Sequence, residues 1–321
     1  MTNKPRAQRA VEGAPLAGIE HIVVVMFENR SFDNVLGALY PPSDGYWGVS
    51  PDLSNTYKKH FWDQSQTVYV TQTPPSGHPP TITPYPDPGE SFDDMTAQIF
   101  GDPNTGVANM SGFAQNYCDL GLATRDPGDI MFYFKPEQMQ VSNLLAGWFA
   151  VCDQWFASGP VQTFPNRMFC HCATPSTWRP VGFLEARVND TDYLSDFTSS
   201  GSVTDTSVFQ LLDGNSGVPD PANWKVYFHD TPMSVLNAYV NDAFTANSPC
   251  LSSFDGSDYD PPHGTTFADD VLNDALPTYA FIEPRYFDNH GGREGLPPNS
   301  NHPGGSDYLG VTGPPIDVTN G

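Results

Sequence analysis

The stretch IEHIVVVMFENRSFDNVLG (residues 19–37) decides the fold class, because an apolar run turns abruptly into polar residues within it. Residues 22–27 are all apolar and rich in β-branched side chains, which predicts a strand buried on both faces of a sheet. Ser31 then has the chemistry of a helix N-cap, and apolar residues recur at helical spacing until a Pro pair. Glu28 and Asn29 therefore fall at the carboxyl end of the strand, where ligands bind in open α/β sheets. On this pattern alone, a turn that only caps the strand is an equal alternative.

The acidic composition limits the classes of ligand that the protein can bind. The chain of 321 residues carries 37 Asp and Glu against 14 Lys and Arg, a formal charge of −23, and no run of basic residues. We therefore expect no binding to nucleic acid and none to an anionic membrane surface. An anionic substrate would need a local cation, namely a bound metal, a helix N-terminus, or the side chains of Arg30 and Arg167.

The N-terminus and the cysteines give expectations about location. Residues 1–18 include basic side chains but no apolar core of a signal peptide, and no stretch of the chain is long and apolar enough to span a bilayer. The sequence thus predicts a tail over residues 1–18, one domain over residues 19–321, and a cytoplasmic location as written. The five Cys are odd in number and lack a disulfide-framework spacing, which predicts mostly buried thiols, with Cys152 inside an apolar run.

Two further apolar runs, at residues 149–153 and 277–284, are interpreted as buried strands, and the second ends in Glu283. Helical spacing at residues 90–101 and 136–148 completes the alternation of strands and helices that is typical of a doubly wound α/β sheet. Because three predicted strands have polar carboxyl ends, one shared site is favoured over three separate turns.

The residue types near these strand ends indicate which chemistry the site could support. Thr163 opens an apparent helix, where backbone N–H dipoles and a metal could make its hydroxyl an alkoxide nucleophile. From position alone, a simple N-cap is the favoured role. Glu28 and Asn29 offer oxygen ligands suited to Mg²⁺, Ca²⁺ or Mn²⁺, although two ligands are too few to close a site. His302, in a Gly/Pro-rich loop, is the best candidate for a catalytic histidine.

Several motifs, in order along the chain, carry a family resemblance. They are HIVVVMFENRSFDNVLG, YPDPGESFDDMTAQIFG, NMSGFAQNY, KPEQMQVSNLLAGWFAVCDQWFAS, TFPNRMFCHCAT, WKVYFHD and LPTYAFIEPRYFD, followed by NHPGG. Together they resemble the phosphoesterase family, which contains bacterial and plant non-specific phospholipases C and related acid phosphatases. The resemblance implies an alkaline-phosphatase-like three-layer α/β sandwich with a mostly parallel central sheet. It also implies hydrolysis of phosphate esters, such as phospholipid head groups, by a metal-assisted hydroxyl nucleophile.

The resemblance assigns roles by position. It makes Thr163 the nucleophile and His302 a second catalytic residue that contacts the phosphate or protonates the leaving group. A divalent metal ion would be held by Glu28, Asn29 and Thr163. The substrate-binding residues would be Asn29, Glu90, Asn166, Arg167 and Glu283.

The chain departs from the family pattern at three places. Glu90 stands where many members have His, and Ser300 stands where an Asp usually precedes the His-Pro pair. The later Asp-Glu-x-Gly-Gly and Asp-His-Val motifs, which supply further metal ligands, do not occur before Gly321. We therefore expect a phosphoesterase domain that lacks its C-terminal part and is a poor catalyst. A phosphatase for soluble monoesters and a non-catalytic remnant are the alternatives, and family members are often secreted.

Overall fold

The computed structural model covers the 321-residue chain and describes most of its domain. The described residues are 18–43, 45–121, 125–175, 177–178, 185–186, 188–193, 203–256, 264–286 and 299–303. The predicted N-terminal tail lies outside them, apart from its last residue. Within these ranges no helix has the length and apolar character needed to cross a membrane.

The strands and α-helices that form the described part of the fold have the following bounds. The strands are β1 (Ile22–Val25), β2 (Ser54–Tyr57), β3 (Gln66–Tyr69), β4 (Thr177–Trp178), β5 (Glu185–Ala186), β6 (Trp224–Phe228), β7 (Leu251–Ser253) and β8 (Tyr279–Ile282). The helices are α1 (Phe32–Leu36), α2 (Phe92–Phe100), α3 (Phe113–Asp119), α4 (Gln140–Trp148), α5 (Thr163–Cys172), α7 (Val208–Leu212), α8 (Ala238–Thr245) and α9 (Phe267–Leu272). Short 3₁₀ turns lie at Pro80–Ile82, Pro103–Thr105, Asp129–Met131, Pro136–Gln138 and Met233–Leu236.

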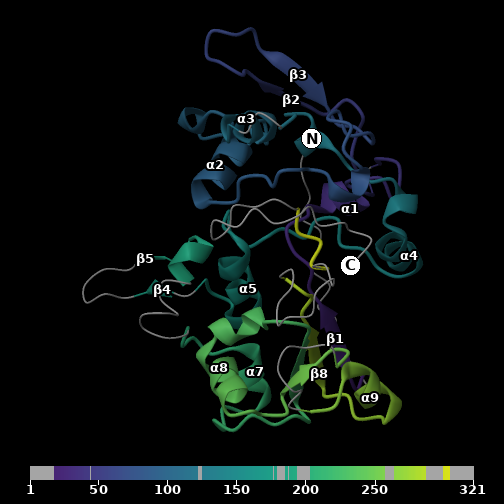
Figure 1. Ribbon diagram of the computed structural model, residues 1–321, viewed down its shortest axis with the longest axis vertical. Coiled ribbons are helices and arrows are strands. Elements are labelled where there is room, and N and C mark those ends of the chain that lie inside the picture. The colour runs from purple at the N-terminus through teal and green to yellow at the C-terminus, as the bar shows by residue number, and fades with distance from the viewer. Residues whose placement is uncertain are drawn as a thin grey trace, which may run out of the picture.

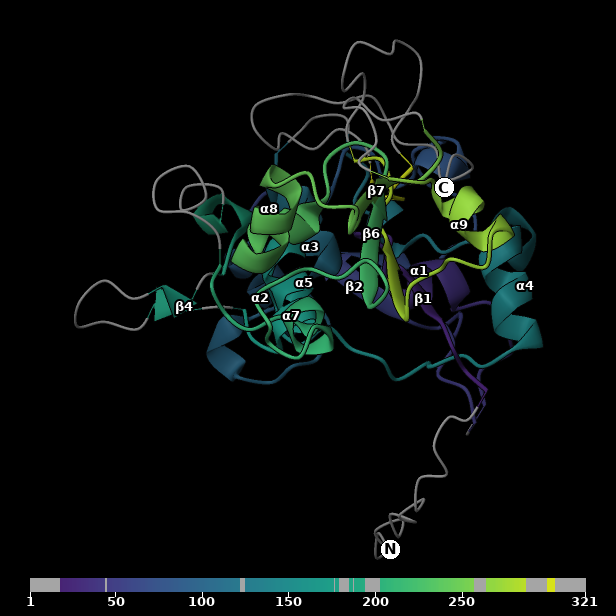
Figure 2. The ribbon, with the colours of Figure 1, turned by 90° about the horizontal axis from the view of Figure 1, so that it is seen from below.

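The central sheet confirms the predicted fold class. Its four described strands lie in the order β1-β8-β6-β7, and every neighbouring pair is parallel. Helices α5, α7 and α8 lie on one side of this sheet and α9 on the other (Figures 1 and 2). This arrangement is a three-layer α/β sandwich. Since all four strands run the same way, their carboxyl ends meet at one edge of the sheet.

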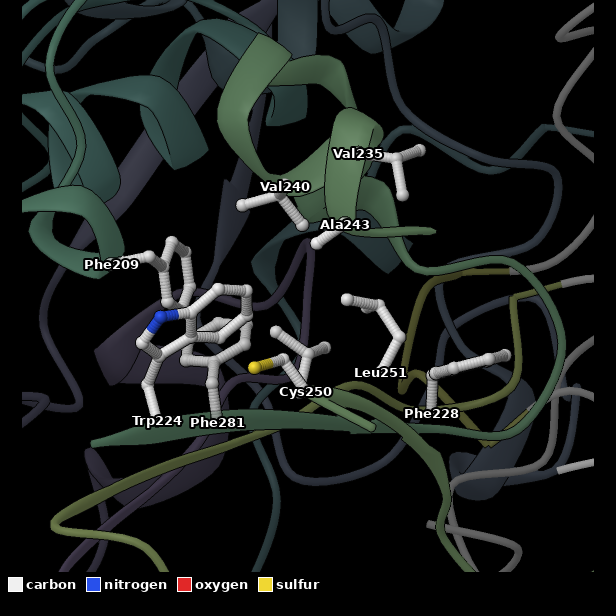
Figure 3. Packing of buried hydrophobic residues seen from close by; sticks show 10 residues of the cluster. Phe209, Trp224, Phe228, Val235, Val240, Ala243, Cys250, Leu251 and Phe281 are labelled. Atoms are coloured by element: carbon white, nitrogen blue, oxygen red, sulfur yellow. The ribbon is translucent and has the colours of Figure 1, made fainter. Parts of the chain in front are cut away.

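The main core fills the space between the sheet and helices α7 and α8 (Figure 3). Alternate residues of β6 point into it, as the period of two in a strand requires. This cluster consists of Phe209, Trp224, Val226, Phe228, Val235, Val240, Ala243, Cys250, Leu251 and Phe281. A smaller cluster of Tyr227, Ala280 and Ile282 covers the opposite face of the sheet, where Phe267 of α9 packs against it. The sheet is thus buried on both faces at β6 and β8.

Strand β1 is not buried on both faces, so this expectation was wrong. Val24 packs against the main core, but Val23 is 42% exposed and Val25 is 51% exposed. The physical reason is the position of β1, which pairs only with β8 and forms an edge of the described sheet. The cluster that Phe267 of α9 covers on the second face of the sheet includes no residue of β1. An apolar run predicts a strand but does not report how completely its neighbours cover it.

The predicted strand at residues 149–153 and the predicted cysteine burial were also wrong. These residues form no strand and follow directly after α4, and Phe149 is 74% exposed. Short apolar runs fit several structures, which explains the error. Of the five thiols, Cys250 alone is buried, while Cys118 and Cys172 are half-buried and Cys152 and Cys170 are exposed.

The helix predictions for residues 90–101 and 136–148 were confirmed as α2 and α4. Helix α2 begins with a capping box, in which Ser91 accepts from the amide of Asp94 and Asp94 accepts from the amide of Ser91. It ends at Gly101, whose φ of 63° few other residues adopt easily. Ser31 likewise caps α1, as predicted.

His171, in the last turn of α5, is buried, and we expect it to make the folded protein less stable in acid. Both ring nitrogens of His171 are buried without a hydrogen-bond partner in the described residues, and its ring packs on Phe209 and Phe281. Burial, reinforced by Arg167, lowers the pKa of His171 to about 3. Below the usual histidine pKa of about 6.5, the unfolded chain therefore binds a proton that the folded protein does not, and the free energy of unfolding falls as the pH drops.

We expect His171→Phe to remove this penalty, which amounts to about 2 kcal/mol at pH 5. Urea unfolding at pH 7 and pH 5 measures the difference. The control is His60→Phe at an exposed position, which should leave the pH dependence of the parent unchanged. An equal loss of stability on acidification in the parent and in His171→Phe would show that this ring is not the responsible group.

Candidate active site

The site begins where β1 ends. The amide of Glu28 donates to the carbonyl of Ser300 at 2.9 Å, which joins the strand end to the segment that carries His302. The next residue, Asn29, has a φ of 56°, a left-handed conformation that Asn tolerates better than most residues. Its side-chain amide donates to Glu90 and lies 3.1 Å from Nε2 of His302. The polar turn thus brings three distant parts of the sequence together.

Asp87, Glu90 and His302 form the most compact cluster of titratable groups at this turn. Nε2 of His302 lies 3.1 Å from Oε1 of Glu90, and Nδ1 lies 3.8 Å from Oδ1 of Asp87. One ligand atom of each residue lies within 4.8 Å of the others. Asp87 is 5% exposed, and its Oδ1 is buried without a hydrogen-bond partner. Such an unpartnered oxygen is costly and calls for a cation or a proton.

The charges in this cluster depend on one another. Burial would lower the pKa of His302, but Asp87 and Glu90 outweigh it and raise that pKa well above its usual range. Burial raises the pKa of Asp87, and the nearby Glu90 adds to the rise. Burial also acts to raise the pKa of Glu90, but His302 lowers it on balance. A protonated His302 beside an ionised Glu90 is the resulting arrangement near neutral pH.

Arg30 holds the loops of the site in place. Its Nε donates to the carbonyl of Asn301 at 2.9 Å, and its Nη1 donates to the carbonyl of Thr83 at 2.5 Å. Burial is the main cause that lowers its pKa to about 10. Because these donors are used by backbone carbonyls, Arg30 joins the segment of His302 to the loop that leads to Asp87.

Thr163 is the first residue of α5 and not its cap. The N-cap position belongs to Gln162, and the hydroxyl of Thr163 makes no hydrogen bond within the described residues. Asp190 accepts from the amide of Phe164 at 2.8 Å, and its own amide donates to the side chain of Gln162 at 2.9 Å. Burial raises the pKa of Asp190 to about 8, against the effect of that amide, and Glu90 and Glu28 add to the rise. Asp190 therefore lies at the start of α5, where the charges of Glu90 and Glu28 act on it.

Arg167 lies one helical turn after Thr163, on the same side of α5. Its Nη2 is 3.7 Å from Oε2 of Glu28, and its guanidinium lies over the ring of Tyr286 at 5.1 Å from the centroid. It is 2% exposed, and none of its three nitrogens has a hydrogen-bond partner among the described residues. Burial alone would lower the pKa of Arg167, but Tyr286, Glu283 and Glu28 raise it overall. A buried, charged fork with free donors is suited to a bound anion.

Burial also raises the pKa of Glu28, although His302 and Arg167 oppose this shift. Its side chain is 14% exposed, so one edge of the carboxylate remains open to a ligand. Glu28 thus links the cluster of His302 to the fork of Arg167.

The side chains of Glu283 and Asn166 form hydrogen bonds mainly with backbone groups of the protein. The two oxygens of Glu283 accept from the amides of Met233 at 2.7 Å and Ser234 at 2.9 Å, and the hydroxyl of Tyr286 donates to it at 2.9 Å. Nδ2 of Asn166 donates to the carbonyl of Val161 at 2.7 Å, in the loop before α5. Glu283 acts on Arg167 through its charge, which helps to raise the pKa of that guanidinium. The Oδ1 of Asn166 is buried without a partner.

The structure therefore connects most of the residues that the sequence predicted. Glu28, Asn29, Glu90, Arg167 and His302 are linked by the contacts above, and Thr163 stands one turn from Arg167. Two residues were missed. Asp87 sits in a Pro-rich loop with no periodic pattern, although its place three residues before Glu90 could have suggested it. Asp190 lies in a loosely patterned polar region that offered no signal.

Comparisons with known proteins agree with one another. The model of the phosphoesterase family matches residues 19–310. Non-specific phospholipase C4 of Arabidopsis thaliana is 32% identical over 305 residues, which cover 89% of this chain and 47% of that protein. Non-specific phospholipase C5 of the same plant is 39% identical over 182 residues, or 51% of this chain and 31% of that protein. Phospholipase C B of Mycobacterium tuberculosis is 27% identical over 303 residues, or 88% of this chain and 54% of that protein. The chain thus spans about half the length, or less, of these curated relatives.

Proposed function

The chain belongs to the phosphoesterase family. We propose that the protein hydrolyses phosphate esters in a reaction of the phospholipase C type, with Thr163 as the nucleophile. The observation that carries this proposal is Arg167. A phosphoryl group would offer two oxygens to its planar fork and so satisfy donors that are otherwise buried without partners. The relatives named as phospholipases C support the same class of substrate.

In the proposed reaction, Oγ of Thr163 attacks phosphorus, and the bond from phosphorus to the lipid alcohol breaks. The amide dipoles at the start of α5 favour negative charge on that oxygen. Asp190, held at the same helical turn, takes the hydroxyl proton, which fits its raised pKa of about 8. The phosphoryl group, still esterified to the head group, becomes bound to Thr163 as a phosphodiester, and water then releases the phosphorylated head group and regenerates the hydroxyl.

His302 supplies the proton for the leaving alcohol. Asp87 and Glu90 hold its pKa well above the usual range, although burial opposes them, so the ring carries a proton near neutral pH. A general acid must reach the leaving oxygen, and Nε2 lies at the end of β1, 3.1 Å from Asn29 and 3.1 Å from Glu90. The same charge would attract the phosphate group.

The site has ligands that fit a divalent metal ion. Asp87 and Glu90 offer two carboxylate oxygens, and Glu28 and Asn29 add further oxygens beside them, whereas the protonated ring of His302 supplies a proton and not a metal ligand. The buried, unpartnered oxygen of Asp87 also fits a cation. When bound, such an ion would offset phosphate charge and lower the pKa of the attacking hydroxyl. Oxygen-rich ligands favour Mg²⁺, Ca²⁺ or Mn²⁺.

Glu28→Gln should weaken metal binding roughly 10- to 100-fold, the loss expected when a group that holds or orients a metal is altered. The substitution keeps the size and one oxygen of the side chain, so the thermal unfolding midpoint should change little. Calorimetric titration with Mn²⁺ measures the affinity. Glu20→Gln, at an exposed position just before β1, is the matched control. Unchanged affinity would make Glu28 a turn residue only.

The activity itself is tested with the full gene product and two chromogenic esters, a phosphodiester and a phosphomonoester, with and without a chelator. We expect chelator-sensitive turnover of the diester. Turnover of the monoester alone would identify a phosphatase for soluble substrates. No turnover of either ester would identify a non-catalytic member of the family.

A further inference from the structure

The tip of the β2–β3 hairpin exposes two adjacent aromatic side chains. The hairpin lies at the end of the molecule away from β1, β8 and α9 (Figure 1). Its tip has the sequence KKHFWDQS (residues 58–65). Phe61 is 85% exposed and Trp62 is 68% exposed. Soluble proteins seldom leave neighbouring large apolar side chains bare unless a partner covers them.

The structure holds this tip in a defined shape. The amide of His60 donates to Asp63 at 3.1 Å, and the amide of Asp63 donates back to the carbonyl of His60 at 2.9 Å. The ring of Trp62 stacks on His60 at 4.8 Å between centroids and meets the edge of Phe61 at 4.7 Å. The aromatic residues therefore pack on one another and not on the core, so their outer surfaces are available to a partner.

Helix α3 anchors the base of the tip. The side chain of Gln115 accepts from the amide of Lys58 at 2.8 Å and donates to its carbonyl at 3.1 Å. The turn is thus fixed to the body of the protein, and ordering it on binding would cost little conformational entropy.

The charge at the tip is opposite to that of the protein as a whole. Lys58 and Lys59 are two of only 14 basic residues in a chain of charge −23, and both are exposed. Asp63 is the single acidic residue within the tip. Repulsion from the acidic body is screened beyond the Debye length of about 8–10 Å at physiological salt, so the local cations decide what this end attracts.

We propose that the tip of the β2–β3 hairpin docks on a phospholipid bilayer, with the aromatic rings at head-group depth and the two lysines on lipid phosphates. Aromatic rings beside basic residues are the composition that such interfaces favour. A protein partner fits less well, because a stable protein interface buries about 800 Å² on each side, more than a narrow turn presents. The inference deepens the proposed function, on which it rests, by placing the substrate in a membrane.

Vesicle co-sedimentation tests the proposal with the full gene product. The probes are vesicles of phosphatidylcholine with and without phosphatidylserine. We expect the parent to bind, and Phe61→Ser/Trp62→Ser to lose roughly tenfold or more in affinity. Lys58→Gln/Lys59→Gln should lose the additional binding that phosphatidylserine provides. The matched control is Trp155→Ser/Phe156→Ser, a second exposed aromatic pair at 80% and 71%, which should bind as the parent does.

Three results would overturn the proposal. They are no binding by the parent, equal binding by the parent and the Phe61→Ser/Trp62→Ser variant, and loss of binding in the control pair alone, which would move the docking surface elsewhere. Hydrolysis of a soluble chromogenic ester separates this inference from the proposed function. The hairpin variants should keep that activity, whereas failure of the parent to hydrolyse the ester would reject the function and leave the vesicle result standing.

Discussion

Thr163→Ala is expected to reduce phosphoester hydrolysis roughly 10⁴-fold or more, the scale of loss when a nucleophile is removed. The fold should survive, because Gln162 and not Thr163 occupies the cap of α5, and the hydroxyl makes no hydrogen bond in the described structure. We expect a stability loss of about 0.5 kcal/mol or less. Steady-state turnover of a chromogenic phosphodiester and thermal unfolding measure the two effects.

Two comparisons make this result specific. Thr163→Ser keeps a hydroxyl at the same place and should retain far more activity than Thr163→Ala. Thr96→Ala removes a hydroxyl that only donates to a carbonyl within α2, so its turnover should match that of the parent. Activity of Thr163→Ala within a few-fold of the parent would reject Thr163 as the nucleophile.

Lys225→Met is expected to destabilise the protein by about 3–5 kcal/mol, because it leaves a buried charge without its partner. Lys225 of β6 is 7% exposed and lies 2.6 Å from Oδ2 of Asp270 on α9, which is 2% exposed. The hydroxyl of Tyr227 also donates to this carboxylate at 2.5 Å, and that of Thr265 donates to its other oxygen. The network fixes α9 on the second face of the sheet. Urea unfolding at pH 7 measures the loss.

The double variant Lys225→Met/Asp270→Leu is the matched control, since replacing both members of a buried pair by apolar groups is often close to neutral. It should recover much of the stability lost in the single variant. If Lys225→Met unfolded at the same urea concentration as the parent, the buried pair would not be what holds α9 in place.

Local patterns predicted the elements of the fold well where two signals agreed. Helix α2 has both apolar spacing and a capping sequence, and β8 has an apolar run bounded by Pro on both sides. The run at residues 149–153 had only its apolar character, and it proved to be an exposed segment after a helix. The predicted burial of β1 was wrong for a different reason, because the elements that cover an edge strand lie far away in the sequence.

The residues of the candidate site also differ in how far the sequence predicts them. Glu28 and Asn29 could be predicted from the strand that delivers them, and Arg167 from the helix that begins at Thr163. Asp87 had only its place three residues before Glu90 as a signal, and Asp190 had none, because neither lies in a segment with a clear period and only the folded chain defines their contacts. The hydrogen bonds of Glu283 could not be predicted either, since its partners lie about fifty residues earlier at residues 233–234.

The most direct test of the proposed mechanism is to trap its covalent intermediate. The full gene product would be mixed with a chromogenic phosphodiester, quenched in acid during turnover and digested for mass spectrometry of the peptide that contains Thr163. We expect an adduct on Thr163 in the parent, made of the phosphoryl group with its remaining ester substituent, and none in Thr163→Ala. Turnover that leaves the adduct on another residue, or that leaves no adduct even at the earliest quench, would contradict nucleophilic attack by Thr163.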